Sequence, residues 1–340
     1  MNDDNRDRRD DSYLWDGTGV PDPDVVGLEK TLGVLRHRGR PLQLPDRPAA
    51  PLKRRAGRLS WLAAAAALIL MAGGVWVIVA LRSSTWSVNS VSGAPAIGGR
   101  AVVTQARLKQ GEWLVTDNQS RARIAVGAIG NVDVDPNTRV QLVEAGREHR
   151  MALDRGTIHA RISAPPRLFF VNTQAAVAVD LGCAYTLQIN ERGEGLLRVT
   201  SGWVALEREG RDAYIPEGAV CPTRNDFGPG TPRYEDAPSG YGEALAVLDF
   251  GRPDDPRRPA ALELVLSAAR RRDGMTLWHL LTRGSIEERA RVYERLATLV
   301  PAPQGVTREL ILAGDRVALN RWWDQLGLDR SWWRLFKKKF

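Results

Sequence analysis

The sequence has little cysteine and histidine and none of the common catalytic motifs. Its 340 residues include two cysteines and four histidines. There is no G-x-S-x-G, no H-E-x-x-H, no phosphate-binding loop, no C-x-x-C, and no G-x-G-x-x-G between a strand and a helix. Each of these patterns positions a nucleophile, a metal ion or a phosphate group, so their absence argues against the corresponding enzymes. We therefore expect no catalytic residue, no metal site and no cofactor.

Charge is absent from one long stretch of the chain. No charged residue occurs between Arg58 and Arg82, and the 23 residues 59–81 are long enough, as a helix, to cross a hydrocarbon core about 30 Å thick. We interpret them as a single transmembrane helix; a cleaved export signal and a buried core helix are the alternatives. Arg and Lys are concentrated before this run, which predicts a protein of the inner membrane with a cytoplasmic N-terminus and periplasmic C-terminal domains.

The chain carries a formal net charge of +8. Much of this excess lies in the basic cluster just before residue 59, where orientation in the membrane and acidic lipid explain it. Membrane lipid is therefore the expected partner of this charge, and nucleic acid is not.

Residues 1–58 contain one predicted helix, in PDPDVVGLEKTLGVLRHR, and a proline-rich linker. Asp22 or Asp24 can cap the helix, Pro23 suits its first turn, and its apolar residues fall on one face. So short a segment has no obvious core, which favours a docking surface for a protein partner. The alternatives are packing against the apolar patch upstream or a helix that lies on the membrane. The candidate partner-binding residues are Tyr13, Leu14, Trp15, Val25, Leu28, Leu32 and Leu35.

Residues 86–236 alternate polar and apolar side chains in short runs separated by glycine and by the turn Asp135-Pro136-Asn137. In RARIAV, for example, Arg121 and Arg123 would point outward and the apolar residues between them inward. At least eight such runs, without helices between them, predict an all-β domain, either a β-solenoid or a sandwich.

Residues 237–340 change to the helical period of 3.6. Pro259 to Arg272 has one apolar face, and Ser285 with Glu288 forms a capping box before the next helix, which Pro301 ends. We expect tryptophans such as Trp278, Trp322 and Trp323 to pack in its core. The predicted fold class is thus multidomain: one transmembrane helix, an all-β domain and a C-terminal all-α domain.

The two cysteines, Cys183 and Cys221, both lie in the portion expected outside the cytoplasm. Disulfides persist in that environment, so a bridge between them is favoured over two buried thiols. Asp180 lies close to Cys183, but no base or oxyanion donor is evident nearby. We therefore expect Asp180 to make turn hydrogen bonds rather than take part in catalysis.

The β region resembles the FecR domain, the envelope-side module of transmembrane anti-sigma regulators. The resemblance covers about residues 86–210 and rests on the order of runs such as LKQGEWLVTD, MALDRGTIHARI, FFVNTQAAVAVDLGCAYTLQI and LLRVTSGWVALE, with a closing V-x-x-G-x-V at Val199, Gly202 and Val204. It implies an FecR-like β domain outside the membrane that receives a signal from an envelope receptor. It also implies a short cytoplasmic segment that binds an extracytoplasmic-function sigma factor.

The sequence departs from the family pattern in two places. Residues 1–58 offer only His37 and no cysteine, so a sigma-binding helix here would be metal-free. The C-terminal portion is helical, which weakens any inference about iron uptake. The sequence therefore favours a single-pass regulator that relays an envelope signal to a sigma factor. The alternative is an anchored envelope scaffold that lacks sigma-factor activity.

Overall fold

The computed structural model describes residues 18, 20–35 and 85–328. The chain divides into two compact units, Met1–Ala65 and Ala66–Phe340. The described part of the first unit is a helix, α2 (Pro23–Leu32), followed by a single 3-10 turn, η1 (Gly33–Leu35). The described part of the second unit, residues 85–328, is here called the body.

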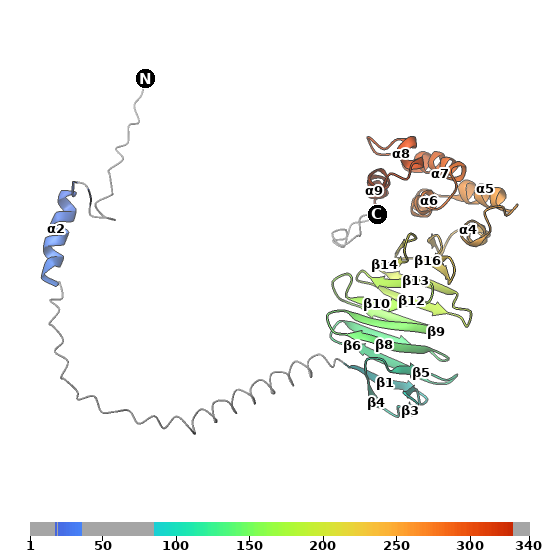
Figure 1. The fold of residues 1–340 in the computed structure, drawn as a ribbon, viewed down its shortest axis with the longest axis horizontal. Helices are drawn as coiled ribbons and strands as arrows, with labels where there is room; N and C mark the ends of the chain where they lie inside the picture. The colour runs from blue at the N-terminus through green and yellow to red at the C-terminus, as the bar shows by residue number, and fades with distance from the viewer. Residues whose placement is uncertain (1–17, 19, 36–84, 329–340) are drawn as a thin grey trace, which may run out of the picture. The chain divides into compact units, whose positions relative to one another are not determined.

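The strands of the body form two hydrogen-bonded ladders (Figure 1). The first ladder runs, in spatial order, through β4 (Gln105–Leu108), β1 (Trp86–Ser92), β6 (Arg121–Val126), β7 (Gly130–Val134), β9 (His149–Ile162), β12 (Ala184–Ile189), β13 (Gly195–Ser201) and β16 (Ala219–Arg224), which pairs with both β17 (Gly228–Pro229) and β18 (Arg233–Tyr234). The second runs through β3 (Arg100–Ala101), β2 (Ala96–Ile97), β5 (Trp113–Val115), β8 (Arg139–Ala145), β9, β10 (Phe169–Asn172), β11 (Val177–Asp180), β14 (Trp203–Glu207) and β15 (Ala213–Pro216).

Strand β9 belongs to both ladders and makes them one continuous sheet. Its first half pairs with β8 and β10, and its second half, from Gly156 onward, pairs with β7 and β12. At the change of ladder, Gly156 has φ +98°, and a Cβ there would lie 2.4 Å from the Cα of Thr138. The Oγ1 of Thr138 accepts a hydrogen bond from the Thr157 amide at 2.9 Å. Only glycine fits a crossing this close, because it lacks a Cβ and tolerates positive φ.

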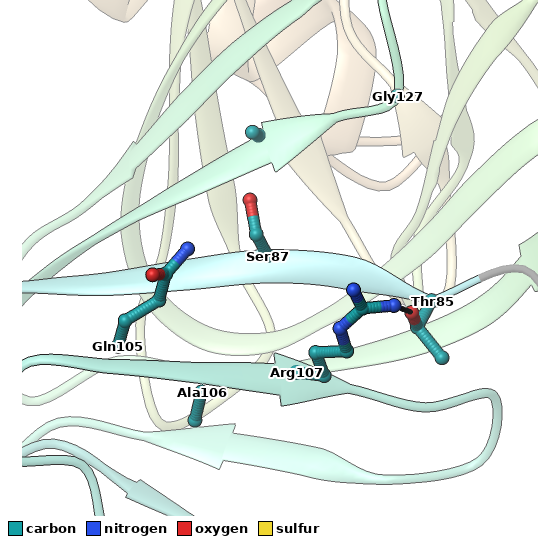
Figure 2. Close-up of a pocket in the computed structure, with 7 residues that line it drawn as sticks. Thr85, Ser87, Gln105, Ala106, Arg107 and Gly127 are labelled. Carbon is teal, nitrogen blue, oxygen red and sulfur yellow. Dashed lines mark hydrogen bonds between the residues drawn. The ribbon is translucent and has the colours of Figure 1, made fainter.

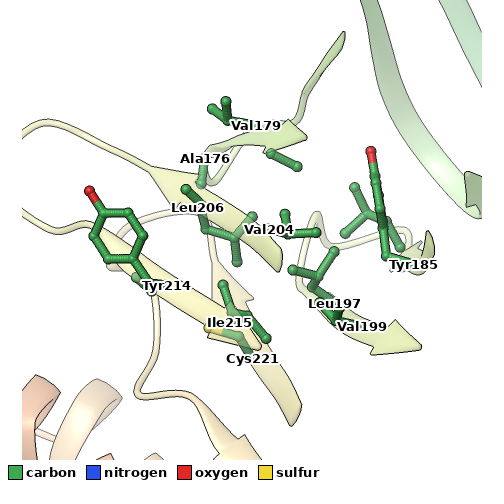
Figure 3. Packing of buried hydrophobic residues seen from close by; sticks show 14 of the residues in the cluster. Ala176, Val179, Tyr185, Leu197, Val199, Val204, Leu206, Tyr214, Ile215 and Cys221 are labelled. Carbon is green, nitrogen blue, oxygen red and sulfur yellow. The ribbon is translucent and has the colours of Figure 1, made fainter. Parts of the chain in front are cut away.

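The core lies between the two ladders because apolar side chains alternate along each strand. In β6, Ala122, Ile124 and Val126 are buried while Arg121 and Arg123 are exposed, as the sequence pattern predicts. Figure 3 shows Leu197 and Val199 of the first ladder in the same cluster as Val204 and Leu206 of the second.

The last strand ends at Tyr234 and the first helix of the body begins at Tyr241. The helices lie at one end of the strand stack in Figure 1. They are α4 (Tyr241–Phe250), α5 (Arg258–Ala268), the 3-10 turn η2 (Arg271–Asp273), α6 (Gly274–Leu281), α7 (Ile286–Leu299), α8 (Arg308–Leu312) and α9 (Arg316–Gln325). The predicted capping box of α7 is confirmed: the Ser285 Oγ accepts from the Glu288 amide, and the Glu288 carboxylate accepts from the Ser285 amide.

Helix α6 joins the helices to the sheet. All eight of its residues are buried. The Nε2 of His279 accepts a hydrogen bond from the Tyr214 amide of β15 at 3.1 Å, and its Nδ1 lies 2.9 Å from the Met275 carbonyl oxygen. A carbonyl oxygen can only accept, so Nδ1 carries the proton and the imidazole is neutral. The edge of β15 is therefore covered by a helix rather than by another strand.

Aromatic rings fill the junction between α6 and the sheet. The Trp323 ring lies 4.7 Å from that of Trp278, 6.0 Å from Tyr214 and 6.2 Å from Trp203, measured between centroids. The expectation that tryptophans pack in the core is met at Trp278, Trp322 and Trp323, which are buried.

The predicted fold class is wrong. Instead of an all-β domain followed by a separate all-α domain, residues 85–328 form a mostly β body whose helices share one hydrophobic core with the sheet. The physical reason is that His279 of α6 accepts a hydrogen bond from the Tyr214 amide of β15, and that the apolar side chains of the helices are buried against the sheet. Among the described residues, no helix has the length and apolar character needed to cross a membrane. The predicted span, residues 59–81, lies outside the described residues.

Replacing Gly156 with alanine should destabilise the body strongly. The added methyl group would meet the Thr138 backbone, so the free energy of unfolding should fall by about 1–3 kcal/mol more than in Gly111→Ala. Gly111 is the matched control because it also has positive φ, +85°, but has open space around its Cα. Urea unfolding of both variants measures the difference, and equal losses would contradict the proposed role of the crossing.

Strands and helices should unfold together. His279→Leu leaves the Tyr214 amide buried without its acceptor and should lower the free energy of unfolding by about 1–3 kcal/mol. Far-ultraviolet circular dichroism, which reports secondary structure, and tryptophan fluorescence, which reports side-chain packing, should still give one coincident transition. Thr298→Ala, an exposed change on α7, serves as the control. Two separate transitions would show that the helices form an independent domain.

Candidate functional site

Helix α2 carries three of the partner-binding residues that the sequence predicts, Val25, Leu28 and Leu32, and η1 carries Leu35. The Asp22 Oδ1 accepts from the Asp24 amide at 2.9 Å, and Pro23 occupies the first turn, as expected for this helix start. No residue of the helix is buried in the structure. The start of the helix is therefore set by its own sequence signals, the Asp22 cap and Pro23.

The apolar face of α2 is open to solvent. Leu28 is 59% exposed, Leu32 55% and Leu35 78%, whereas Val25 is half-buried. Val34, which the sequence analysis did not single out, is also exposed. Tyr13, Leu14 and Trp15 lie outside the described residues. A contiguous apolar face of this kind is typical of a helix that binds in a partner's groove.

The predicted disulfide is absent from the structure, where Cys183 and Cys221 are free, buried thiols. Strand β13 separates them: Cys221 pairs with Leu197 of β13, and Cys183 precedes β12 on the other side. Two strand spacings of about 4.8 Å exceed the Cα separation of about 7 Å that a disulfide permits. The prediction of a bridge was wrong because it used the compartment and not the strand order.

Asp180 makes the turn contacts expected of it. It is 1% exposed, its Oδ1 accepts from the Gly182 amide at 2.9 Å, and its Oδ2 accepts from the Cys183 thiol. Burial raises the pKa of Asp180 to about 6, although the hydrogen bonds from Cys183 and Gly182 oppose this. Burial likewise raises the pKa of the Cys183 thiol. A neutral thiol beside a carboxylate is a poor nucleophile, so this pair is structural.

A surface pocket of about 460 Å³ lies on β1, β4 and β6 (Figure 2). The Arg107 Nη1 donates to the Thr85 Oγ1 at 3.4 Å, and Arg107 is the one ionisable residue of the lining. Its lining holds the hydroxyls of Thr85 and Ser87 but no carboxylate, histidine, lysine or cysteine, the side chains that commonly act as general acids and bases. Nor do the described residues include three or more His, Cys, Asp or Glu side chains grouped to hold a metal ion.

A buried ionic cluster between sheet and helices escaped the sequence analysis. Asp249 of α4, which is 5% exposed, accepts from the Arg211 guanidinium at 2.9 Å and lies 3.5 Å from that of Arg283. Thr231 donates to the same carboxylate from its amide and its hydroxyl. Burial, together with the charge of Arg283, lowers the pKa of Arg211. These residues are far apart in the sequence, so no local pattern could have indicated the cluster.

Comparison with known families identifies the central part of the body. The sequence model of the family described as FecR protein matches residues 112–205. This chain carries a FecR domain. The match begins just before β5 and ends within β14, so it includes the crossing strand β9 and both ladders beside it. Strand β15 and all the helices lie beyond it.

Among solved structures, two crystal structures of a candidate anti-sigma factor from Parabacteroides distasonis ATCC 8503 are similar to this chain. Both are 13% identical with a TM-score of 0.32, over 39% of this chain and 63% and 62% of theirs. This chain thus spans less than two thirds of their length, and a likeness this weak supports no conclusion about function. None of the curated proteins compared with the chain matches it.

The raised pKa of Asp180 should make stability depend on pH. Because the folded protein binds this proton more tightly than the unfolded chain does, the resulting stability is fully present below pH 3.8 and is lost as the pH rises through about 6. A shift of this size corresponds to about 3 kcal/mol.

Asp180→Asn should therefore be more stable than the natural protein at pH 7.5 and close to it at pH 4, as measured by urea unfolding. Asp226→Asn, which removes an exposed carboxylate, is the control. A difference between natural protein and Asp180→Asn that stays constant with pH would contradict the burial effect.

Proposed function

We propose that this protein is a non-enzymatic FecR-type regulator that holds a sigma factor on helix α2 and receives an envelope signal on its body. The observation that carries the proposal is the exposed apolar face of α2, in a chain that also carries a FecR domain. Regulators that combine these two parts use the helical segment to bind sigma factor, and the FecR domain to respond to an envelope protein.

The chemistry of α2 supports a protein partner. Leu28 and Leu32 are one turn apart on the same face, and each would bury its side chain in a groove of the partner. Burying a leucine contributes about 1.5–3 kcal/mol, so two of them account for a large part of a specific interaction. The helix begins with its own side-chain cap, so the proposal invokes no metal.

The described body offers no catalytic constellation, which is consistent with a binding role for it. Contact with an envelope protein or receptor is part of the proposal. The location of the two units on opposite sides of the inner membrane stays a prediction from the uncharged run 59–81, since residues 36–84 lie outside the described residues.

Changing the apolar face of α2 should abolish sigma-factor binding. The full-length chain is co-expressed with each extracytoplasmic-function sigma factor of the same cell, and binding is measured by co-purification and titration calorimetry. Leu28→Glu and Leu32→Glu should each weaken binding at least tenfold, because each places a charge in an apolar contact. Lys30→Glu, on the opposite face, is the matched control and should bind like the natural protein.

Two results would contradict the proposal. One is that no sigma factor co-purifies with the full-length chain, and the other is that the leucine variants bind as tightly as the Lys30 control. If, in addition, replacing residues 1–50 with an unrelated soluble segment left the cellular function intact, the anchored scaffold would be the better interpretation.

A further inference from the structure

The body contains a second cavity, of about 380 Å³, where the sheet meets the helices. One wall is the β14–β15 turn, and the others are the end of α6, the start of α7 and the turn from α8 to α9. We call it the arginine pocket, defined by Gly210, Arg211, Asp212, Trp278, Leu281, Thr282, Arg283, Arg289, Gly314, Arg316 and Leu319. It lies outside the residues that match the FecR family.

Two of the four arginines that line the pocket are held in place from behind. Arg211 and Arg283 share the carboxylate of Asp249. Arg211 also donates from Nε to the Pro229 carbonyl at 2.9 Å, and Arg283 donates from Nη2 to the Asp212 carbonyl at 3.0 Å. These guanidinium groups are therefore fixed before any ligand arrives, which lowers the entropy cost of binding.

The other two arginines have no acidic partner within the described residues. Neither Arg289 nor Arg316 has a carboxylate within 4.0 Å in that part of the chain. The Nε of Arg289 is shielded from solvent and has no hydrogen-bond acceptor there. A buried guanidinium N–H without an acceptor is costly, and proteins normally supply an anion to such a group.

The charges of the pocket do not balance. Four guanidinium groups face it, whereas the carboxylates beside them are those of Asp249 and Asp212. Asp212 also accepts from the Arg208 amide at 3.1 Å. Asp315, between the lining residues Gly314 and Arg316 in the sequence, caps α9 by accepting from the Ala318 amide at 2.8 Å. The pocket is therefore cationic and suited to an anion.

Three apolar side chains lie behind the arginines. Trp278, Leu281 and Leu319 are 1%, 0% and 5% exposed, and Trp278 is held by a hydrogen bond from its Nε1 to the Leu319 carbonyl at 2.8 Å. They present almost no surface to a ligand, so the guanidinium groups would select it. The glycines at 210 and 314 add no side chain to the pocket.

From this geometry we propose that the arginine pocket binds a small anion, in which a carboxylate or phosphate group meets Arg289 and Arg316. Guanidinium forks pair with either oxyanion through two parallel hydrogen bonds. Such a ligand would touch the β14–β15 turn and three helices at once. The inference does not rest on sigma-factor binding and stands or fails independently of it.

Titration calorimetry and thermal unfolding of the full-length chain test the proposal with four probes: benzoate, phenyl phosphate, neutral benzamide and inorganic phosphate. Benzoate or phenyl phosphate should bind with a Kd of about 1 mM or tighter, as expected for a ligand of so few atoms. Neutral benzamide should bind at least about tenfold more weakly, because it lacks the charge, whereas inorganic phosphate should bind in the same range as phenyl phosphate. Which of the two aromatic anions binds more tightly identifies the oxyanion.

Variants localise the binding. Arg289→Gln should weaken the better anion at least tenfold, and Arg316→Gln, an exposed and milder change at the mouth of the pocket, should weaken it in the same direction. Arg252→Gln is the matched control, because Arg252 is an exposed arginine of the body that pairs with Asp254. Circular dichroism checks that each variant is folded. The proposal is overturned if none of the three anions binds, if benzamide binds equally well, or if both pocket variants bind like the control.

Discussion

The last strand of one ladder, β15, has backbone groups on its outer side that no further strand pairs, and much of the molecule follows from how they are satisfied. His279 accepts from the Tyr214 amide, and Arg283 donates to the Asp212 carbonyl nearby. Both residues come from α6 or its end. A helix can be buried in this place only if its side chains are apolar or hydrogen-bonded. All of α6 is buried, and its Trp278 packs against Trp323 of α9.

This arrangement explains why sheet and helices are one body. The helices would expose their apolar faces without the sheet, and the sheet would expose an open edge without the helices. Where the two meet, charged groups that hold the junction together, Arg211, Asp249 and Arg283, also form one side of the arginine pocket. The residues that match the FecR family supply the central strands of both ladders, and the segment beyond them supplies β15 and the helices that cover its edge.

Local features could be predicted from the sequence, whereas features that depend on strand order could not. The alternation of Arg121 and Arg123 with apolar residues and the capping box at Ser285 each involve a few neighbouring residues, and both are present. Whether Cys183 and Cys221 can form a disulfide depends on the strand order, because β13 lies between them. The role of His279 could not be predicted from its neighbours in the sequence, because it depends on the edge of β15 that lies beside it in space. The helix α2 and its apolar face could be predicted because the periodicity and the cap involve only neighbouring residues.

Every strand pairs with partners at most five places away in chain order, and this has a consequence for how the protein is made. A chain that emerges from its N-terminal side can assemble one rung after another, because the partners of each new strand are close to it in the sequence. During synthesis, the most recently formed strand has an unpaired edge that other molecules can bind. This edge is covered only after the segment containing His279 has been synthesised. Chaperone protection, or rapid synthesis of that segment, would therefore matter most for the yield of folded protein.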